Sequence, residues 1–269
     1  MAYEPELEFA KAVALEAGAV MRKYFRSDQL NTVRKDDLTP LTVADSTINA
    51  LVIERVKRDF PGHGVLGEEE SYFPNRSWIW VVDPIDGTIP YSCGIPVSTF
   101  SLALVARSDG QPVVSVTLDP FLDELMYAVL GQGSFLEGKK GKLQTSDVKS
   151  LHGEYISQGS GLWSSGKGPD LDMGPIVTAL QRNETKGLNF LSAVYGARQV
   201  ARGNFATSFL LYGSPWDSAA VALLVREAGG IVSDVFGKQR RYDEFAQGCL
   251  LSANQLVHDR MLEILCLGR

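Results

Sequence analysis

The chain has 269 residues, of which 45% are apolar and 22% are charged, proportions that are ordinary for a globular protein. Its 32 acidic residues outnumber its 26 lysines and arginines, which gives a net charge of −6. A polyanion such as a nucleic acid would be repelled on average, so we expect no nucleic-acid partner. The length suits one large domain or two closely joined halves.

Nothing in the sequence suggests an exported or membrane protein. The first residues include Glu4 and Glu6 and do not resemble a secretory signal. The longest uncharged stretch, residues 87–106, is interrupted by Pro90 and Pro96, and its apolar part is too short to span a bilayer. The three cysteines are widely separated and fit neither a disulfide framework nor a zinc pattern. We therefore expect a cytoplasmic protein with reduced thiols and no membrane partner.

The first part of the chain combines two helical patterns with several strand patterns. Apolar residues recur at helical spacing over residues 5–26 and 42–60, and Pro61-Gly62 ends the second pattern. Short apolar runs follow, bounded by turn-forming Gly, Pro and Asp residues. They lie at residues 65–66, 78–82, 98–106, 113–118 and 125–130. These runs predict a meander of mostly antiparallel strands.

The second part alternates between helical and strand patterns. A polar stretch rich in Gly and Lys, residues 138–147, is a plausible joint between two halves, which we place at residues 1–142 and 143–269. Helical patterns cover residues 176–182, 193–201, 216–228 and 255–265. Strand patterns cover residues 205–211, 230–235 and 249–252. Helices and antiparallel strands in blocks indicate a layered α+β architecture.

The hexapeptide Asp83-Pro84-Ile85-Asp86-Gly87-Thr88 follows the apolar run at residues 78–82 and carries the strongest chemical signal. Carboxylates that emerge from a strand end can bind one or two hard cations, and Mg²⁺ requires oxygen ligands in octahedral geometry. The carbonyl of Ile85, in the turn between Asp83 and Asp86, is a further candidate ligand. Gly87 allows the backbone to approach a ligand closely. A lone Asp would more often mark a simple turn, but the whole hexapeptide favours a metal site.

Two more acidic segments qualify as ligands. Within Glu68-Glu69-Glu70, we expect Glu68 to point inward, because it directly follows an apolar run, and Glu70 to be solvated. Asp217 follows Trp216 at the start of an apolar helical pattern. By itself Asp217 could also be an N-terminal helix acid that favours the helix dipole.

Together these segments resemble, in order, the signature series of the inositol monophosphatase family, the lithium-sensitive, metal-dependent sugar phosphatases. The resemblance implies a layered αβαβα sandwich of the inositol monophosphatase and fructose-1,6-bisphosphatase type, with Mg²⁺ as cofactor and a homodimer as assembly. It rests on Lys35, Thr42, Asp45, Glu68-Glu69, the hexapeptide, Trp216-Asp217-Ser218-Ala219-Ala220 and Glu227-Ala228-Gly229-Gly230.

Position by position, the resemblance implies three metal positions. Glu68, Asp83 and the Ile85 carbonyl would hold one Mg²⁺ ion. Asp83, Asp86 and Asp217 would hold a second, and Glu68 would help to hold a weaker third. Two close metal ions can supply a hydroxide and clamp the entering and leaving oxygens of a phosphoryl transfer.

The resemblance also implies catalytic and substrate-binding residues. Thr88 would orient the attacking water with Asp45 as its partner, and Glu68 would take part in catalysis as a metal ligand. The backbone N–H groups of Gly87 and Thr88 would face the phosphate. The other expected substrate contacts are Asp86, Ser192, Ala193 and Leu210.

Three departures from the family pattern concern the substrate. Inositol-selective members carry an acid seven positions before the Asp of Trp-Asp, whereas this chain has Leu210. Where the family has a Gly-Thr-Ala turn, this chain has Leu191-Ser192-Ala193. The residues that follow its Gly-Thr, Ile89-Pro90-Tyr91, also differ from those of the family. A site built to pair hydroxyls loses selectivity when a partner becomes apolar.

These departures leave the substrate open while the predicted activity is hydrolysis of a small phosphorylated metabolite. We expect an inositol-phosphate-like, sugar or polyol monoester less hydroxylated than inositol, with histidinol phosphate as the alternative. A nucleotide phosphatase and a non-catalytic regulatory protein of the same fold are further alternatives. The second is disfavoured because all four metal-binding carboxylates are present. No Cys is followed six residues later by Arg, which excludes a cysteine phosphatase.

Overall fold

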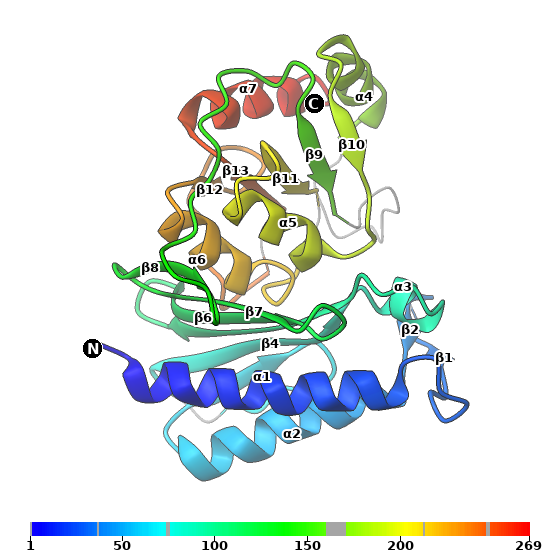
Figure 1. The fold of residues 1–269 in the computed structure, drawn as a ribbon, viewed down its shortest axis with the longest axis vertical. Coiled ribbons are helices and arrows are strands. Elements are labelled where there is room, and N and C mark those ends of the chain that lie inside the picture. Colours follow the sequence, from blue (N-terminus) through cyan, green and yellow to red (C-terminus); the bar gives the residue numbers. More distant parts are fainter. Residues whose placement is uncertain (1, 37, 74–75, 160–170, 212, 246–247) are drawn as a thin grey trace.

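Five layers, helix–sheet–helix–sheet–helix, build the protein in a computed structural model (Figure 1). The structure describes residues 2–36, 38–73, 76–159, 171–211, 213–245 and 248–269. The architecture is the layered α+β sandwich that the sequence predicts. Among the described residues, no helix has the length and apolar character needed to cross a membrane.

The first layer consists of α1 (Glu4–Tyr24) and α2 (Val43–Asp59), which match the two predicted helices. In α1, acids in the first turn and bases in the last complement the helix dipole. In α2, Thr42 and Asp45 form a capping box, in which each side chain bonds the other residue's backbone N–H. The apolar faces of both helices pack on the first sheet.

The first sheet contains six strands in the order β3-β4-β5-β6-β7-β8. From β4 onward the strands form an antiparallel meander, as predicted, while β3 pairs parallel to β4. The strands are β3 (Gly64–Gly67), β4 (Trp78–Asp86), β5 (Thr99–Ala106), β6 (Gln111–Asp119), β7 (Glu124–Val129) and β8 (Gly133–Leu136).

Strand β4 runs four residues further than the sequence predicts. We expected it to end at Val82, but it continues through the hexapeptide to Asp86. Its pairing with β5 is irregular between Asp83 and Asp86. Pro84 lies in this irregular stretch, where a residue without an N–H donor is tolerated. The two carboxylates therefore belong to a distorted strand end.

The middle layer consists of α5 (Ala193–Ala201) and α6 (Ala219–Glu227) between the two sheets (Figure 1). Every residue of α6 from Ala219 to Val225 is buried, since the helix packs on β6 and β7 and also contacts β12 and β13. The predicted helix at residues 216–228 begins later than expected, so Asp217 lies in the turn before α6.

The second sheet has five strands in the order β10-β9-β11-β13-β12, and α4 (Met173–Arg182) and α7 (Gln255–Cys266) cover its outer face. The strands are β9 (Tyr155–Gln158), β10 (Lys186–Leu188), β11 (Thr207–Leu210), β12 (Ile231–Ser233) and β13 (Cys249–Ser252). All strands of the first sheet lie within residues 64–136 and all strands of the second within residues 155–252. The division of the chain into halves at residue 142 stays a prediction.

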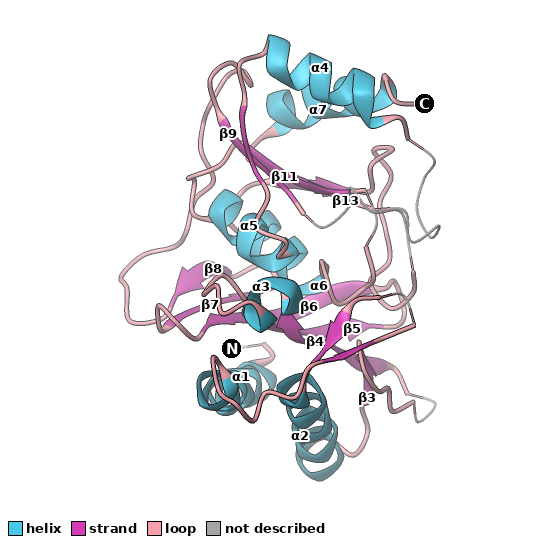
Figure 2. Cartoon of the chain, turned by 90° about the vertical axis from the view of Figure 1, so that its right-hand side faces the viewer, coloured by secondary structure: helices cyan, strands magenta, loops and turns pink. Residues whose placement is uncertain are grey.

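Short elements complete the fold and were not predicted. They are the hairpin β1 (Val33–Arg34) and β2 (Pro40–Leu41), the helix α3 (Thr88–Ser92), and strands β8, β9 and β10. Helix α3 lies at one side of the molecule (Figure 1), between the level of α5 and that of α1 and α2 (Figure 2). Tyr91 anchors α3, because its buried hydroxyl donates to the Met21 carbonyl of α1 at 2.6 Å.

We expect Tyr91→Phe to lower the free energy of unfolding by about 1 kcal/mol, because the change keeps the ring but removes a buried hydrogen bond, while the Met21 carbonyl keeps its bond from the Phe25 N–H. Urea denaturation followed by circular dichroism measures this loss. Tyr155→Phe, at a half-exposed ring, is the control and should change stability by less than about 0.5 kcal/mol. Equal effects at both positions would contradict the anchoring role.

Candidate functional site

Asp83 is the centre of a cluster of acidic side chains. Its side chain is 2% exposed, and its Oδ1 accepts a hydrogen bond from the Ile85 N–H at 3.0 Å. Burial raises its pKa well above the usual range, and the charges of Glu68, Asp86 and Asp217 raise it further. The structure thus brings together the four carboxylates that the sequence predicts, although they come from three distant segments.

Asp86, 4% exposed, is held by the start of α5. Its carboxylate accepts hydrogen bonds from the Ser192 hydroxyl, from the Ala193 N–H at 2.8 Å and from the Val194 N–H at 3.1 Å. A helix N-terminus favours a negative charge. Burial raises the pKa of Asp86, and these hydrogen bonds oppose the rise. Ser192 and Ala193, predicted as substrate contacts, therefore bond a predicted metal ligand.

Glu68 lies at the end of β3, and its backbone N–H donates to the Val82 carbonyl at 3.3 Å. Lys35, from the β1–β2 hairpin, donates to Glu68 at 2.9 Å and to Glu69 at 2.6 Å. Burial lowers the pKa of Lys35, but the two glutamates raise it by more. Glu68 is half-buried and Glu70 is exposed, in agreement with the predicted orientations.

Asp217 occupies the turn that leads into α6, where its Oδ2 accepts the Ser214 N–H at 2.7 Å. Burial raises its pKa to about 7, and the charges of Glu68 and Asp86 add to the rise. An acid that only favoured the helix dipole would have no reason to lie beside other carboxylates. The position of Asp217 therefore supports the metal-ligand interpretation over the helix-capping one.

Thr88 and Asp45 lie side by side, as the predicted pairing requires. The Thr88 hydroxyl is 3.4 Å from Asp45 Oδ1 and 3.0 Å from the Ile85 carbonyl. Burial raises the pKa of Asp45 to about 7, against the opposing hydrogen bonds from Thr42. Gly87 adopts φ +82°, a left-handed conformation that favours glycine, and a Cβ there would meet Ser192.

Leu210 is 1% exposed and packs in the core between the sheets with residues of α5 and α6. Contact between Leu210 and a substrate stays a prediction. Leu191 has φ +53°, in the left-handed region that a leucine rarely adopts and that suits glycine better.

The donor set fits hard cations. Four carboxylates and a backbone carbonyl supply only oxygen, and burial and mutual repulsion leave excess negative charge for a cation to offset. Among the residues that the structure describes, no three acidic, histidine or cysteine side chains lie close enough together to hold a metal ion as they stand. Three of the carboxylates bond separate protein groups instead. Glu68 bonds Lys35, Asp86 bonds the start of α5, and Asp217 bonds the Ser214 amide.

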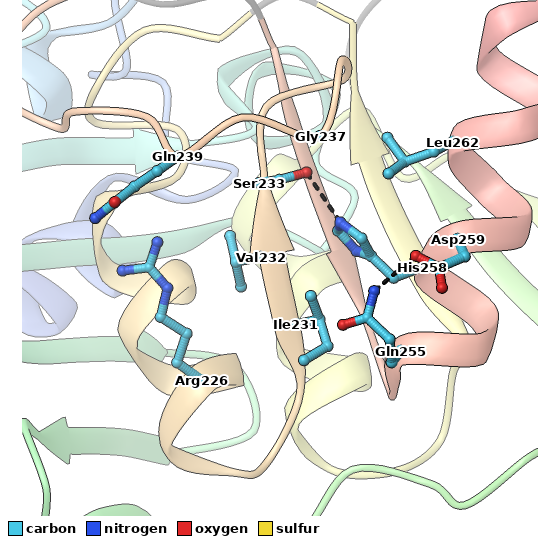
Figure 3. A pocket seen from close by; sticks show the side chains of 10 residues that line it. All are labelled: Arg226, Ile231, Val232, Ser233, Gly237, Gln239, Gln255, His258, Asp259 and Leu262. Carbon is cyan, nitrogen blue, oxygen red and sulfur yellow. Dashed lines mark hydrogen bonds between the residues drawn. The ribbon is translucent and has the colours of Figure 1, made fainter.

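A depression of about 470 Å³ elsewhere in the molecule offers no comparable chemistry (Figure 3). It lies between β12 and α7, and His258 lines it. Both ring nitrogens of His258 are engaged, with the Ser233 hydroxyl at 2.9 Å and the Ser252 hydroxyl at 3.2 Å. Burial lowers its pKa, so this histidine is a neutral core residue.

Comparison with known proteins agrees with the geometry. A model described as "Inositol monophosphatase family" matches residues 2–267. The chain belongs to the inositol monophosphatase family. A histidinol-phosphatase of Mycobacterium tuberculosis is 34% identical over 98% of each chain, and Nus factor SuhB of Salmonella typhimurium is 30% identical over 96% of this chain and 94% of the relative. An IMPase structure from Thermotoga maritima superposes with a TM-score of 0.84 at 26% identity, covering 97% and 96% of the two chains.

Several residues that support this family site escaped the sequence analysis. Thr99 donates to Asp86 at 3.1 Å, and Asn49 holds the turn that carries Glu68. Arg240, 3% exposed, lies 4.9 Å from the Tyr242 ring centre and lowers the pKa of Asp217. No local pattern singles out these residues, because each contacts the site from a distant segment of the chain.

The raised pKa of Asp217 predicts a gain in stability when its charge is removed. A carboxyl with a pKa near 4 unfolded and about 7 folded binds its proton more tightly in the folded state, so its contribution to stability falls as pH rises from about 4 to about 7. In EDTA at pH 8, Asp217→Asn should therefore raise the free energy of unfolding by about 1 kcal/mol or more.

Urea denaturation of both proteins at pH 5 and pH 8 measures this difference. The advantage of Asp217→Asn should be larger at pH 8 than at pH 5. A variant that is less stable than the wild type at pH 8 would show that burial and the neighbouring charges do not make ionised Asp217 unfavourable.

Proposed function

We propose that the protein is a Mg²⁺-dependent phosphatase that hydrolyses a small phosphate monoester. The observation that carries the proposal is the convergence of Glu68, Asp86 and Asp217 on buried Asp83, where each charge raises the pKa of the central carboxyl. Membership of the inositol monophosphatase family supports the same activity.

The cofactor ligands would be those that the sequence suggests. Glu68, Asp83 and the Ile85 carbonyl would hold one Mg²⁺, and Asp83, Asp86 and Asp217 would hold another, with Glu68 also contributing to a weaker third position. Bound Mg²⁺ acidifies water and neutralises phosphate charge, the dominant need for a slowly hydrolysed monoester. The protein supplies fixed oxygens, because α5 and Ser214 already orient Asp86 and Asp217.

The remaining residues act on the water and the phosphate. The Thr88 hydroxyl would accept a hydrogen bond from the attacking water and donate its own hydrogen to Asp45. The raised pKa of Asp45 suits this carboxylate to take up a proton near neutral pH. The N–H groups of Gly87 and Thr88 would bond the phosphate oxygens. As the water oxygen would bond to phosphorus, the bond to the ester oxygen would break, and that oxygen would take a proton from a solvent water and leave as an alcohol.

The substrate would be less hydroxylated than inositol, and histidinol phosphate is the leading candidate. Leu210 replaces an acid and lies in the core, and Leu191 adds an apolar side chain beside Ser192. The relative with 34% identity is named a histidinol-phosphatase, which favours this candidate among sugar, polyol and nucleotide monophosphates.

A non-catalytic regulatory role is the second candidate function, because a relative with 30% identity is named a Nus factor. Retention of all four metal-binding carboxylates argues for catalysis. Release of phosphate by the purified protein would separate the two. We also propose that the protein is a cytoplasmic homodimer. Light scattering of the purified chain measures its molar mass and so tests the assembly.

We expect phosphatase activity to require Mg²⁺ and to vanish in EDTA. Li⁺ should inhibit, and Ca²⁺ should inhibit because its larger, looser coordination misplaces the water. Asp217→Asn should lower kcat by about 100-fold or more while the fold persists. Phosphate release at several metal concentrations measures these effects, and full activity of metal-free protein would overturn the proposed function.

The substrate proposal predicts a ranking of kcat/KM. Histidinol phosphate should exceed myo-inositol 1-phosphate by about 5- to 150-fold, since each unpaired inositol hydroxyl costs roughly 1–3 kcal/mol. Glycerol 2-phosphate and a nucleoside monophosphate complete the panel. Inositol phosphate as the best substrate by about tenfold would refute the inference from Leu210. Leu210→Glu would bury a charge in the core and is expected to destabilise the fold.

A further inference from the structure

The turn that carries Glu68, residues 67–70, rests directly on α2. Asn49 of α2 is 1% exposed, and its Nδ2 donates to the Glu70 carbonyl at 2.9 Å. A Cβ on Gly67 would come within 2.3 Å of Asn49 Oδ1 and 2.4 Å of the Glu70 carbonyl. Only glycine fits at this position, so the turn packs directly against the Asn49 amide.

Other contacts also hold this turn. The Glu68 N–H bonds to Val82, and the Ser71 hydroxyl lies 3.2 Å from the Gly67 nitrogen. The Glu68 carboxylate itself bonds Lys35 of the short β1–β2 hairpin. If a cation takes the place of the Lys35 ammonium, the backbone of the turn decides where the carboxylate lies.

The amide of Asn49 does more for this turn than for the stability of the core. Its Oδ1 is buried without a hydrogen-bond partner among the described residues, which is costly. An apolar side chain of similar size would avoid that cost. The hydrogen bond that the amide supplies goes to the turn, so the chemical identity of this residue serves the position of Glu68.

Asn49 also lies one helical turn after Asp45, and residues four apart share a face of a helix. Asp45 contacts Thr88, as Asn49 contacts the Glu68 turn. One face of α2 therefore supports both the predicted water-orienting hydroxyl and a predicted metal ligand.

We propose that Asn49 is a positioning residue that fixes the turn at residues 67–70 and thereby sets the affinity of the site for Mg²⁺ through Glu68. The inference rests on the proposed function, because it assumes that Glu68 is a metal ligand. It adds a determinant of that affinity that does not itself contact the ion.

Isothermal titration of Mg²⁺ into wild type, Asn49→Ala and Asn49→Leu tests the proposal without relying on turnover. Loss of a hydrogen bond that orients a ligand weakens metal binding by about 10- to 100-fold, and we expect the Kd for Mg²⁺ to rise about tenfold in both variants. At saturating Mg²⁺, kcat and the KM for the ester should stay within about threefold of wild type. Asn49→Leu has a side chain of similar size and no amide, so it provides the test if Asn49→Ala does not fold.

Asn183→Ala is the matched control. Its Nδ2 also donates to a backbone carbonyl, that of Ala179 at 2.8 Å, but at the end of α4 in the outer layer (Figure 1). This variant should lose comparable stability in urea denaturation with no change in Kd.

The outcomes separate the two proposals. Wild-type protein that binds no Mg²⁺ would overturn the proposed function and this inference with it. Wild-type binding that persists unchanged in both Asn49 variants would overturn this inference alone. A rise in Kd of equal size in Asn183→Ala would also overturn it, because general loosening of the fold would then explain the effect.

Discussion

Repulsion among the carboxylates that surround buried Asp83 is the constraint on which the rest of this site depends. Desolvation and the charges of Glu68, Asp86 and Asp217 all disfavour the ionised form of Asp83. A chain folded for stability alone would not gather these groups in its interior. The arrangement makes sense as a site that stores unfavourable charge until cations offset it, which is a common conflict between stability and function.

The surrounding structure stabilises each of three carboxylates with a different hydrogen-bond donor. The start of α5 takes Asp86, the Ser214 amide takes Asp217, and Lys35 takes Glu68. Because α5 and Ser214 come from the C-terminal part of the chain, the site assembles only when the middle helices pack between the two sheets. The layered fold and the candidate site therefore depend on the same packing.

Much of the fold could be predicted because long amphipathic patterns and turn-bounded apolar runs are local signals. The helices at α1, α2, α5 and α7 and the meander from β4 to β7 follow from such patterns. Strand β10 could not be predicted, because its three residues, Lys186–Leu188, are all exposed and include a glycine, and only pairing with β9 makes them a strand. The extension of β4 to Asp86 likewise depends on pairing with β5.

The sequence by itself determined the identity and order of the acidic motifs, and with them the family and the candidate metal ligands, because those residue types at those spacings are rare outside such sites. Only the tertiary structure decided what holds each ligand. The bonds from α5 to Asp86 and from Asn49 to the Glu68 turn join residues far apart in the chain, and Leu210 proved to be a core residue. Such contacts follow from how layers pack, which no local pattern encodes.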